Sequence, residues 1–175
     1  MGNPELHSST PEARLGLRYL LLGCVAVAVI AIDQITKTLA VDRLADGPVD
    51  VVHGVLTLRL TLNSGGAFGI LQGLPGVFVA ASLVVVGLVF FWVRRLTRPA
   101  LVVPLGLMLG GGLGNVADRL FRDLNGKVVD FIDLHVWPVF NVADACIVSG
   151  IALLLFASMR ASGSGRDRPL VRDEP

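Results

Sequence analysis

Four long apolar segments alternate with polar connections along this chain of 175 residues. We expect helices over about residues 15–40, 75–93, 99–117 and 139–159. Each segment is close to the roughly 20 apolar residues that an α-helix needs to cross a hydrocarbon layer. The segments lack the alternation that strands of membrane β-barrels show. The pattern therefore predicts a mainly α membrane protein with four transmembrane helices.

Between the first two helices, the pattern changes to a period of two residues. From Val55 to Asn63, aliphatic residues alternate with Thr and Arg, which is typical of a half-buried strand. A glycine-rich stretch follows, and glycine lets a backbone turn sharply and approach a ligand closely. We expect a small extracytoplasmic β-sheet element over about residues 49–69. Glycine content alone favours a plain turn there as much as a ligand-binding loop.

Arginines indicate how the helices are oriented, since cationic loops lie on the cytoplasmic side of a membrane. Three groups flank the apolar segments: Arg14 and Arg18; Arg94, Arg95 and Arg98; and Arg160, Arg166, Arg168 and Arg172. All three groups lie on one side when four helices are threaded through a membrane. Both termini are therefore expected in the cytoplasm, with residues 41–74 and 118–138 facing outward.

The composition supports one integral membrane domain over residues 1–175. Apolar residues make up 53% and charged residues 17% of the chain, and soluble domains carry about 25% charged residues. The net charge of +1 provides no basic field for a nucleic-acid partner. Two cysteines form neither a disulfide framework nor a metal cluster. The polar tails, about residues 1–13 and 161–175, are expected to be disordered.

Ionisable residues inside apolar segments are costly and mark functional sites by default. Asp144 lies about one turn into the fourth segment, and Asn141, three residues earlier, shares its helix face and can cap the helix. Asp33 lies in the first segment, with Lys37 one turn beyond. We expect Asp33 to form a structural ion pair, either with Lys37 at i,i+4 or with a residue of another helix.

The third segment ends in small residues, followed by further acids. Four glycines there favour close helix packing: Gly110, Gly111, Gly112 and Gly114. The sequence Asn-Val-Ala-Asp occurs at residues 115–118 and again at residues 141–144. Arg119 directly follows Asp118, which favours an ionised carboxylate with a scaffold role. Asp130 lies between apolar pairs with no adjacent base, and such surroundings raise the pKa of a carboxyl group.

A carboxylate pair is the remaining usable chemistry. The histidines are scattered, and no motif of a zinc peptidase or serine hydrolase is present. Two close Asp side chains share one proton, so one can accept a proton from water while the other protonates a carbonyl oxygen. Peptide hydrolysis by this route requires no metal and no organic cofactor. Asp144 is the first member, and residue chemistry leaves the second between Asp118 and Asp130.

Five short motifs resemble those of bacterial lipoprotein signal peptidases, the type II signal peptidases, and occur in the same order. They are Asp33-Gln34 with Lys37; Asn63-x-Gly65-x-Ala67-Phe68; Gly111-Gly112-x-Gly114-Asn115-x-x-Asp118-Arg119; Val128-Val129-Asp130-Phe131; and Phe140-Asn141-x-Ala143-Asp144. The resemblance covers about residues 30–146. It implies an aspartic endopeptidase of the bacterial plasma membrane that cleaves prolipoproteins before a diacylglyceryl-modified cysteine.

The resemblance also implies roles for individual residues. The catalytic pair falls on Asp130 and Asp144. The supporting or substrate-binding residues are Asp33, Asn63, Gly65, Asn115, Asp118, Arg119, Asn141 and Ala143. Further implications are inhibition by globomycin-type cyclic peptides, contact with membrane lipid, and an active site near the extracytoplasmic face. We expect a monomer, and the roles of His135 and Trp137 stay open.

Two other classes of function remain alternatives. A small proton-coupled transporter also uses intramembrane acids and glycine-rich helices, but the acids here gather at one interface rather than through the full depth of the membrane. A non-catalytic membrane scaffold would bind lipidated peptide without cutting it.

Overall fold

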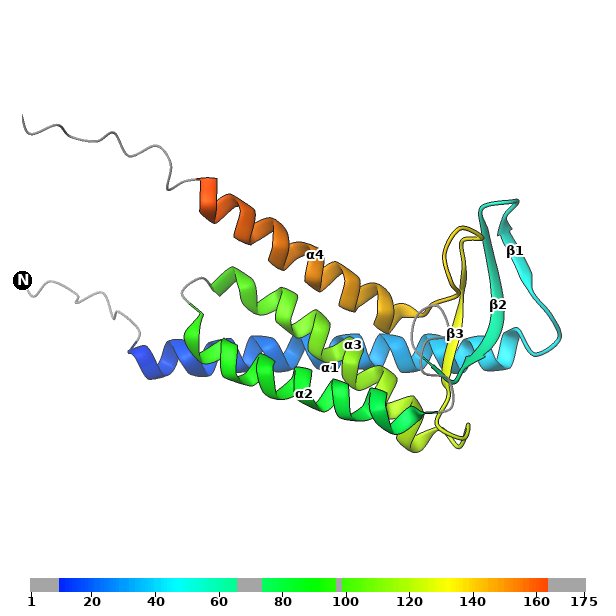
Figure 1. Cartoon of the computed structure of the whole chain (residues 1–175), viewed down its shortest axis with the longest axis horizontal. Helices are drawn as coiled ribbons and strands as arrows, with labels where there is room; N and C mark the ends of the chain where they lie inside the picture. The colour runs from blue at the N-terminus through cyan, green and yellow to red at the C-terminus, as the bar shows by residue number, and fades with distance from the viewer. Residues whose placement is uncertain (1–9, 66–73, 97–98, 164–175) are drawn as a thin grey trace, which may run out of the picture.

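The computed structural model describes residues 10–65, 74–96 and 99–163. Four helices run side by side, and a three-stranded sheet lies at one end of the bundle (Figure 1). The helices are α1 (Pro11–Arg43), α2 (Pro75–Arg95), α3 (Val102–Phe121) and α4 (Val142–Gly163), and the 3-10 helix η2 (Pro99–Leu101) precedes α3. All four α-helices are long and apolar enough to cross a membrane. The predicted fold class is therefore confirmed.

Several helix ends differ from the predicted ones. Helix α1 already begins at Pro11, because the Thr10 side chain accepts a hydrogen bond from the backbone nitrogen of Ala13 at 3.3 Å and proline is favourable at the first helical position. The predicted tail over residues 1–13 is therefore too long, and so is the tail over residues 161–175, since α4 continues to Gly163. Residues 1–9 and 164–175 lie outside the described part of the chain.

The other ends shift by shorter stretches. Helix α1 continues past residue 40 to Arg43, α2 past residue 93 to Arg95, and α3 past residue 117 to Phe121. Helix α4 begins at Val142 rather than residue 139. Polar residues extend the C-terminal ends of α1, α2 and α3 beyond their apolar runs, so hydropathy alone places these three ends too early.

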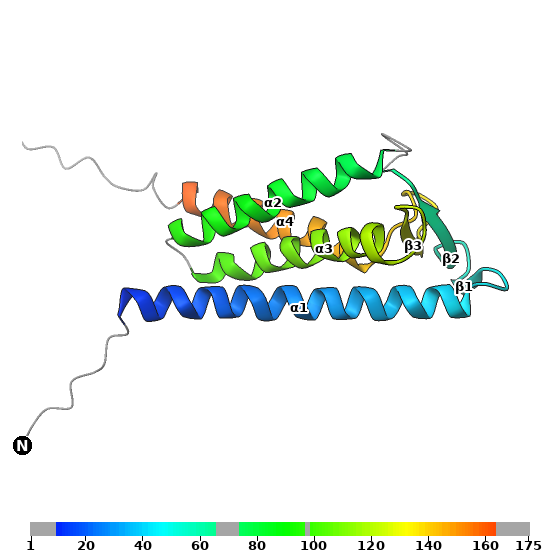
Figure 2. The same cartoon turned by 90° about the horizontal axis from the view of Figure 1, so that it is seen from below.

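Helix α3 is the centre of the bundle and lies between α1 and α2 in Figure 2. Of its apolar window, 56% is buried, against 17% or less in the other helices. A Cβ atom at Gly110 would lie 2.7 Å from the backbone oxygen of Ala26 in α1, and one at Gly111 would overlap the backbone oxygen of Ala143 in α4. These two glycines have the predicted packing role. Gly112 does not, because nothing lies within 4 Å of its Cβ position.

The antiparallel sheet has the order β1-β2-β3, with β1 at Val49–Val52, β2 at Leu56–Asn63 and β3 at Val128–Asp133. The predicted strand up to Asn63 is confirmed by β2, and residues 66–69 of the predicted element lie outside the described residues. No strand was predicted over residues 128–133. The first four residues of β3 are all buried, so its sequence lacks the alternation that marks a half-buried strand.

The core of the bundle changes character along its length. Away from the sheet, the helices pack around apolar side chains: Leu22, Ala26, Val89, Val93, Val102, Leu105 and Leu109. Toward the sheet, the side chains with less than 2% exposure include polar ones: Asp33, Lys37, Asp118, Asp130 and Asn141. Buried polar groups need partners, and these residues find them in one another.

Candidate active site

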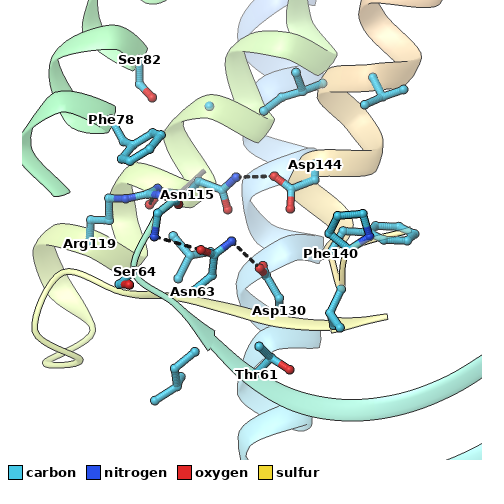
Figure 3. Close-up of a pocket in the computed structure, with 18 of the residues that line it drawn as sticks. Thr61, Asn63, Ser64, Phe78, Ser82, Asn115, Arg119, Asp130, Phe140 and Asp144 are labelled. Atoms are coloured by element: carbon cyan, nitrogen blue, oxygen red, sulfur yellow. Dashed lines mark hydrogen bonds between the residues drawn. The ribbon is translucent and has the colours of Figure 1, made fainter. Parts of the chain in front are cut away.

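A cleft of about 700 Å³ opens where the sheet meets the helices. Its lining comes from β2, β3 and the helices α2, α3 and α4 (Figure 3). Asp130 enters this cleft from β3, and Asp144 enters it from the first turn of α4. The two acids come from different secondary-structure elements, a strand and a helix, and line the same cleft.

Asp130 is almost completely buried, with 1% of its surface exposed. One carboxyl oxygen accepts a hydrogen bond from the side-chain amide of Asn141 at 2.7 Å. The other accepts from the side-chain amide of Asn63 at 2.9 Å, as Figure 3 shows. Burial raises the pKa of Asp130 to about 7, and the nearby Asp144 carboxyl adds to this increase, while the two amide hydrogen bonds and Lys37 oppose it. Asp130 can therefore carry a proton near neutral pH.

Asp144 is held by the geometry of a helix start. The side-chain oxygen of Asn141 accepts from the backbone nitrogen of Asp144 at 2.9 Å, and a carboxyl oxygen of Asp144 accepts from the backbone nitrogen of Asn141 at 3.3 Å. This reciprocal pair is a capping arrangement and confirms the predicted cap. The other carboxyl oxygen accepts from the side-chain amide of Asn115 at 2.8 Å (Figure 3). Asn141 thus contacts both acids of the cleft.

The backbone after β2 is tied to α3. Asn63 accepts a hydrogen bond from the nitrogen of Gly65 at 2.9 Å, and Arg119 donates to the oxygen of Gly65 at 3.1 Å. The Arg119 guanidinium also lies over the ring of Phe78 in α2, at 4.9 Å from its centroid. These contacts shape one wall of the cleft. Ala67 and Phe68 of the same motif lie outside the described residues.

Asp118 does not line the cleft. One of its carboxyl oxygens contacts Lys37 at 3.0 Å and accepts from the backbone nitrogen of Val129 at 3.0 Å. The other accepts from Gln34 at 2.8 Å and from Arg122 at 3.2 Å. The expected scaffold role fits this arrangement, but the cations that pair with Asp118 are Lys37 and Arg122 rather than the adjacent Arg119.

Asp33 connects α1 to α3 and α4. It forms the expected ion pair with Lys37 at 2.8 Å, and its other oxygen accepts from the backbone nitrogen of Ala143 at 3.0 Å. Gly114 leaves room for this carboxylate, because a Cβ atom there would lie 2.7 Å from it. Ala143 is fully buried at the start of α4. Asp33 therefore helps to fix the helix turn that carries Asp144.

Three residues outside the predicted site belong to the same network. Gln34 and Arg122 both bind Asp118, and Arg122 also donates to the Gln34 side-chain oxygen at 3.1 Å. The pairing of Arg122 with Asp118 could have been predicted from the sequence, because Arg122 lies four residues after Asp118 on the same helix. Lys37, which pairs with Asp33, also contacts Asp118 and Asn115 of α3. No sequence signal identifies that second set of partners.

A second polar cluster lies on the sheet. The Thr57 hydroxyl donates to Asp50 at 2.6 Å and lies 3.1 Å from the ring nitrogen of His135, while His53 lies 3.2 Å from Asp50. Trp137, in contrast, lines the cleft. Among residues 10–65, 74–96 and 99–163, no three His, Cys, Asp or Glu side chains gather in a way that could hold a metal ion.

Comparison with known proteins gives the family. Residues 25–160 match the family described as Signal peptidase (SPase) II. The lipoprotein signal peptidase of Mycobacterium avium is 45% identical over 158 residues, which cover 87% of this chain and 86% of the relative. The lipoprotein signal peptidase of Mycobacterium tuberculosis is 43% identical over 164 residues, covering 90% and 78%.

A solved structure agrees with this result. A bacterial membrane enzyme determined by the in meso method at 2.3 Å resolution superposes with a TM-score of 0.74 at 26% identity, covering 89% of this chain and 94% of that chain. Four helices of transmembrane length make this chain a multi-pass membrane protein. The chain belongs to the signal peptidase II family, and it is a membrane peptidase.

Proposed function

We propose that this protein is an aspartic endopeptidase that removes signal peptides from prolipoproteins, with Asp130 and Asp144 as its catalytic pair. Cleavage takes place just before the diacylglyceryl-modified cysteine. One observation carries the proposal: two acids from separate elements line one cleft, and Asn141 contacts both of them. The names of the relatives and the resemblance of the motifs support the substrate class.

The geometry supports a two-step reaction with a balanced exchange of protons. At the start, Asp130 carries the shared proton and Asp144 is a carboxylate. A water molecule transfers a proton to Asp144 while its oxygen attacks the peptide carbonyl carbon, and Asp130 transfers its proton to the carbonyl oxygen. Asp130 then takes a proton from a hydroxyl of this neutral tetrahedral intermediate as Asp144 protonates the leaving nitrogen. The C–N bond breaks, and both acids return to their starting state.

The apolar wall of the cleft suits a lipid-modified substrate. Phe78 of α2 and Ile147 and Val148 of α4 line the cleft. Val148 is 62% exposed on the surface of its helix, so the cleft continues into a surface that faces lipid in a membrane. The diacylglyceryl chains therefore enter from the side, while β2 supports the peptide. A globomycin-type inhibitor occupies the same cleft.

The proposed orientation is based on the helix ends. The start of α1, the end of α2, η2 and the end of α4 all lie at the end of the bundle opposite the sheet (Figure 1). Of the arginines used in the positive-inside argument, the described ones lie at these helix ends: Arg14, Arg18, Arg94, Arg95 and Arg160. We place both termini in the cytoplasm and the active site near the extracytoplasmic face of the bacterial plasma membrane. The protein acts there as a single integral membrane domain and as a monomer.

The test is cleavage of a diacylglyceryl prolipoprotein peptide by the purified full-length protein, with products identified by mass spectrometry. The wild type is expected to release a fragment that begins with the lipid-modified cysteine, and a globomycin-type inhibitor should block this release. Asp130→Asn is expected to lower turnover by about 10³-fold or more, because acid–base catalysis is lost.

The matched control is Asp133→Asn. Asp133 is the other buried acid of β3, pairs with Arg59 at 2.8 Å and does not line the cleft. We expect it to keep most of its turnover per folded protein. Substantial turnover in Asp130→Asn would refute the assignment, and binding of the peptide by the wild type without cleavage would support the scaffold alternative.

A further inference from the structure

Lys37 lies at the centre of the buried polar cluster and has no exposed surface. Its ammonium group has three N–H donors. Three oxygen atoms surround it: one from Asp33 at 2.8 Å, one from Asp118 at 3.0 Å and the side-chain oxygen of Asn115 at 2.9 Å. The two carboxylates compensate the buried positive charge of Lys37. The contact with the neutral Asn115 amide adds no charge compensation, but it fixes the orientation of that amide.

This contact determines which way the Asn115 amide points. A side-chain amide has an acceptor oxygen on one side and a donor nitrogen on the other, and an ammonium group cannot accept a hydrogen bond. The oxygen of Asn115 must therefore face Lys37, and Asn141 donates to the same oxygen at 3.1 Å. The nitrogen of Asn115 is left pointing at Asp144, to which it donates at 2.8 Å (Figure 3).

We propose that Lys37 is a positioning residue that, by orienting Asn115, keeps Asp144 as the carboxylate of the pair and leaves the shared proton on Asp130. This inference rests on the proposed function. It assigns each acid its role in the first step: Asp144 accepts the proton from water, and Asp130 protonates the carbonyl oxygen. A donor aimed at a carboxylate favours the ionised form of that group. Lys37 forms no hydrogen bond or ion pair with either catalytic acid, and its link to Asp144 runs through the Asn115 amide.

The environment of Asp130 agrees with this distribution of the proton. The charged groups that act on Asp130 come from three helices: Asp144 from α4, Lys37 from α1 and Arg119 from α3. Burial is the largest influence and raises the pKa of Asp130, and the negative charge of Asp144 raises it further. The hydrogen bonds from Asn63 and Asn141 and the charge of Lys37 lower it by less, so the net direction is upward. A proton on Asp130 next to a carboxylate on Asp144 is thus the arrangement that these contacts favour.

A matched pair of variants separates two effects of Lys37 on activity: the orientation of the Asn115 amide and the net charge of the buried cluster. Both variants are made in the Asp33→Asn background. Asp33→Asn removes one negative charge, so the loss of the positive charge of Lys37 leaves the net charge of the cluster as in the wild type. In this background, Lys37→Gln retains an N–H donor for Asn115, whereas Lys37→Met has a similar length and no donor. Asp33→Asn alone is the reference, and thermal unfolding in detergent gives the folded fraction of each protein.

We expect Asp33→Asn/Lys37→Met to lower kcat by about 10- to 100-fold relative to Asp33→Asn, with KM nearly unchanged, because small losses of positioning carry penalties of this size. Asp33→Asn/Lys37→Gln is expected to recover most of this loss. A lysine with only a structural role would give equal kcat values per folded protein in the two double variants. That result would overturn the proposal.

A second measurement uses only proteins that keep Lys37. Infrared spectroscopy of the resting enzyme detects the C=O stretch of a protonated carboxyl group. We expect this band in the wild type and in Asp144→Asn, and we expect Asp130→Asn to lack it. Loss of the band in Asp144→Asn, with retention in Asp130→Asn, would place the proton on the wrong acid and overturn the proposal. Cleavage by the wild type and its loss in Asp130→Asn test the proposed function separately from both measurements.

Discussion

The sequence Asn-Val-Ala-Asp occurs twice beside the cleft, and the two copies differ in what their residues contact. At residues 141–144, the copy spans the start of α4, where Asn141 caps the helix and Asp144 enters the cleft. At residues 115–118, the copy lies inside α3, where the backbone amides already have helical partners. The side chain of Asn115 is therefore free to reach across to Asp144.

The two acids of these copies have different partners. Asp118 faces α1 and contacts the cations Lys37 and Arg122. Asp144 accepts hydrogen bonds from neutral amides of Asn115 and Asn141, and within the described residues it has no ion pair. The same local sequence thus gives a buried, ion-paired carboxylate at Asp118 and a carboxylate that lines the cleft at Asp144. Position relative to a helix end, rather than the motif itself, decides the role.

The largest expected effect comes from the α4 copy. Asp144→Asn is expected to lower kcat for prolipoprotein cleavage by about 10³-fold or more, because the pair loses its proton acceptor. The introduced amide has one acceptor oxygen, so it can keep only one of the two hydrogen bonds that Asn115 and the backbone of Asn141 donate to separate carboxyl oxygens. The thermal midpoint of unfolding in detergent should therefore fall only modestly.

The same substitution in the α3 copy should reduce stability strongly and activity only weakly. Asp118→Asn breaks the buried ion pair with Lys37 and the partly buried one with Arg122. It is expected to lower the free energy of unfolding by about 3 kcal/mol. The folded fraction should remain far more active than Asp144→Asn. Native thermal stability together with loss of all cleavage in Asp118→Asn would show that the two copies have been assigned the wrong way round.

A smaller effect is expected from Asn141, which serves both the helix cap and Asp130. Asn141→Ala should cost about 1 kcal/mol of stability through loss of the cap, whereas Asn141→Ser keeps a capping oxygen and should cost less. Both variants lose the amide that donates to Asp130, so we expect kcat to fall about tenfold in each. If Asn141→Ser keeps the kcat of the wild type, this amide has no part in catalysis.

Much of the fold could be predicted because membrane helices are recognised from composition alone. The four apolar runs, the alternation up to Asn63 and the cap at Asn141 each depend on residues that are close in sequence. The ion pair of Asp33 and Lys37, one turn apart, is local in the same sense.

The features that could not be predicted depend on contacts between distant segments. Strand β3 is buried by α1 and β2, and its Asp133 is 5% exposed and paired with Arg59 from β2. Adjacency suggested Arg119 as the partner of Asp118, but neighbours on a helix point about 100° apart. The choice between Asp118 and Asp130 as the second acid depended on the resemblance, because no local pattern shows which of them reaches the cleft.

The pH dependence of kcat/KM for prolipoprotein cleavage tests the central claim most directly. The pKa of Asp130 is raised to about 7 by burial and by Asp144, so Asp130 carries its proton below this pH and loses it above. Since the reaction needs one proton on the pair, we expect kcat/KM to fall tenfold for each pH unit above about 7. A profile that stays flat from about pH 6 to pH 9, in a protein that remains folded throughout, would contradict the claim that these two acids share the catalytic proton.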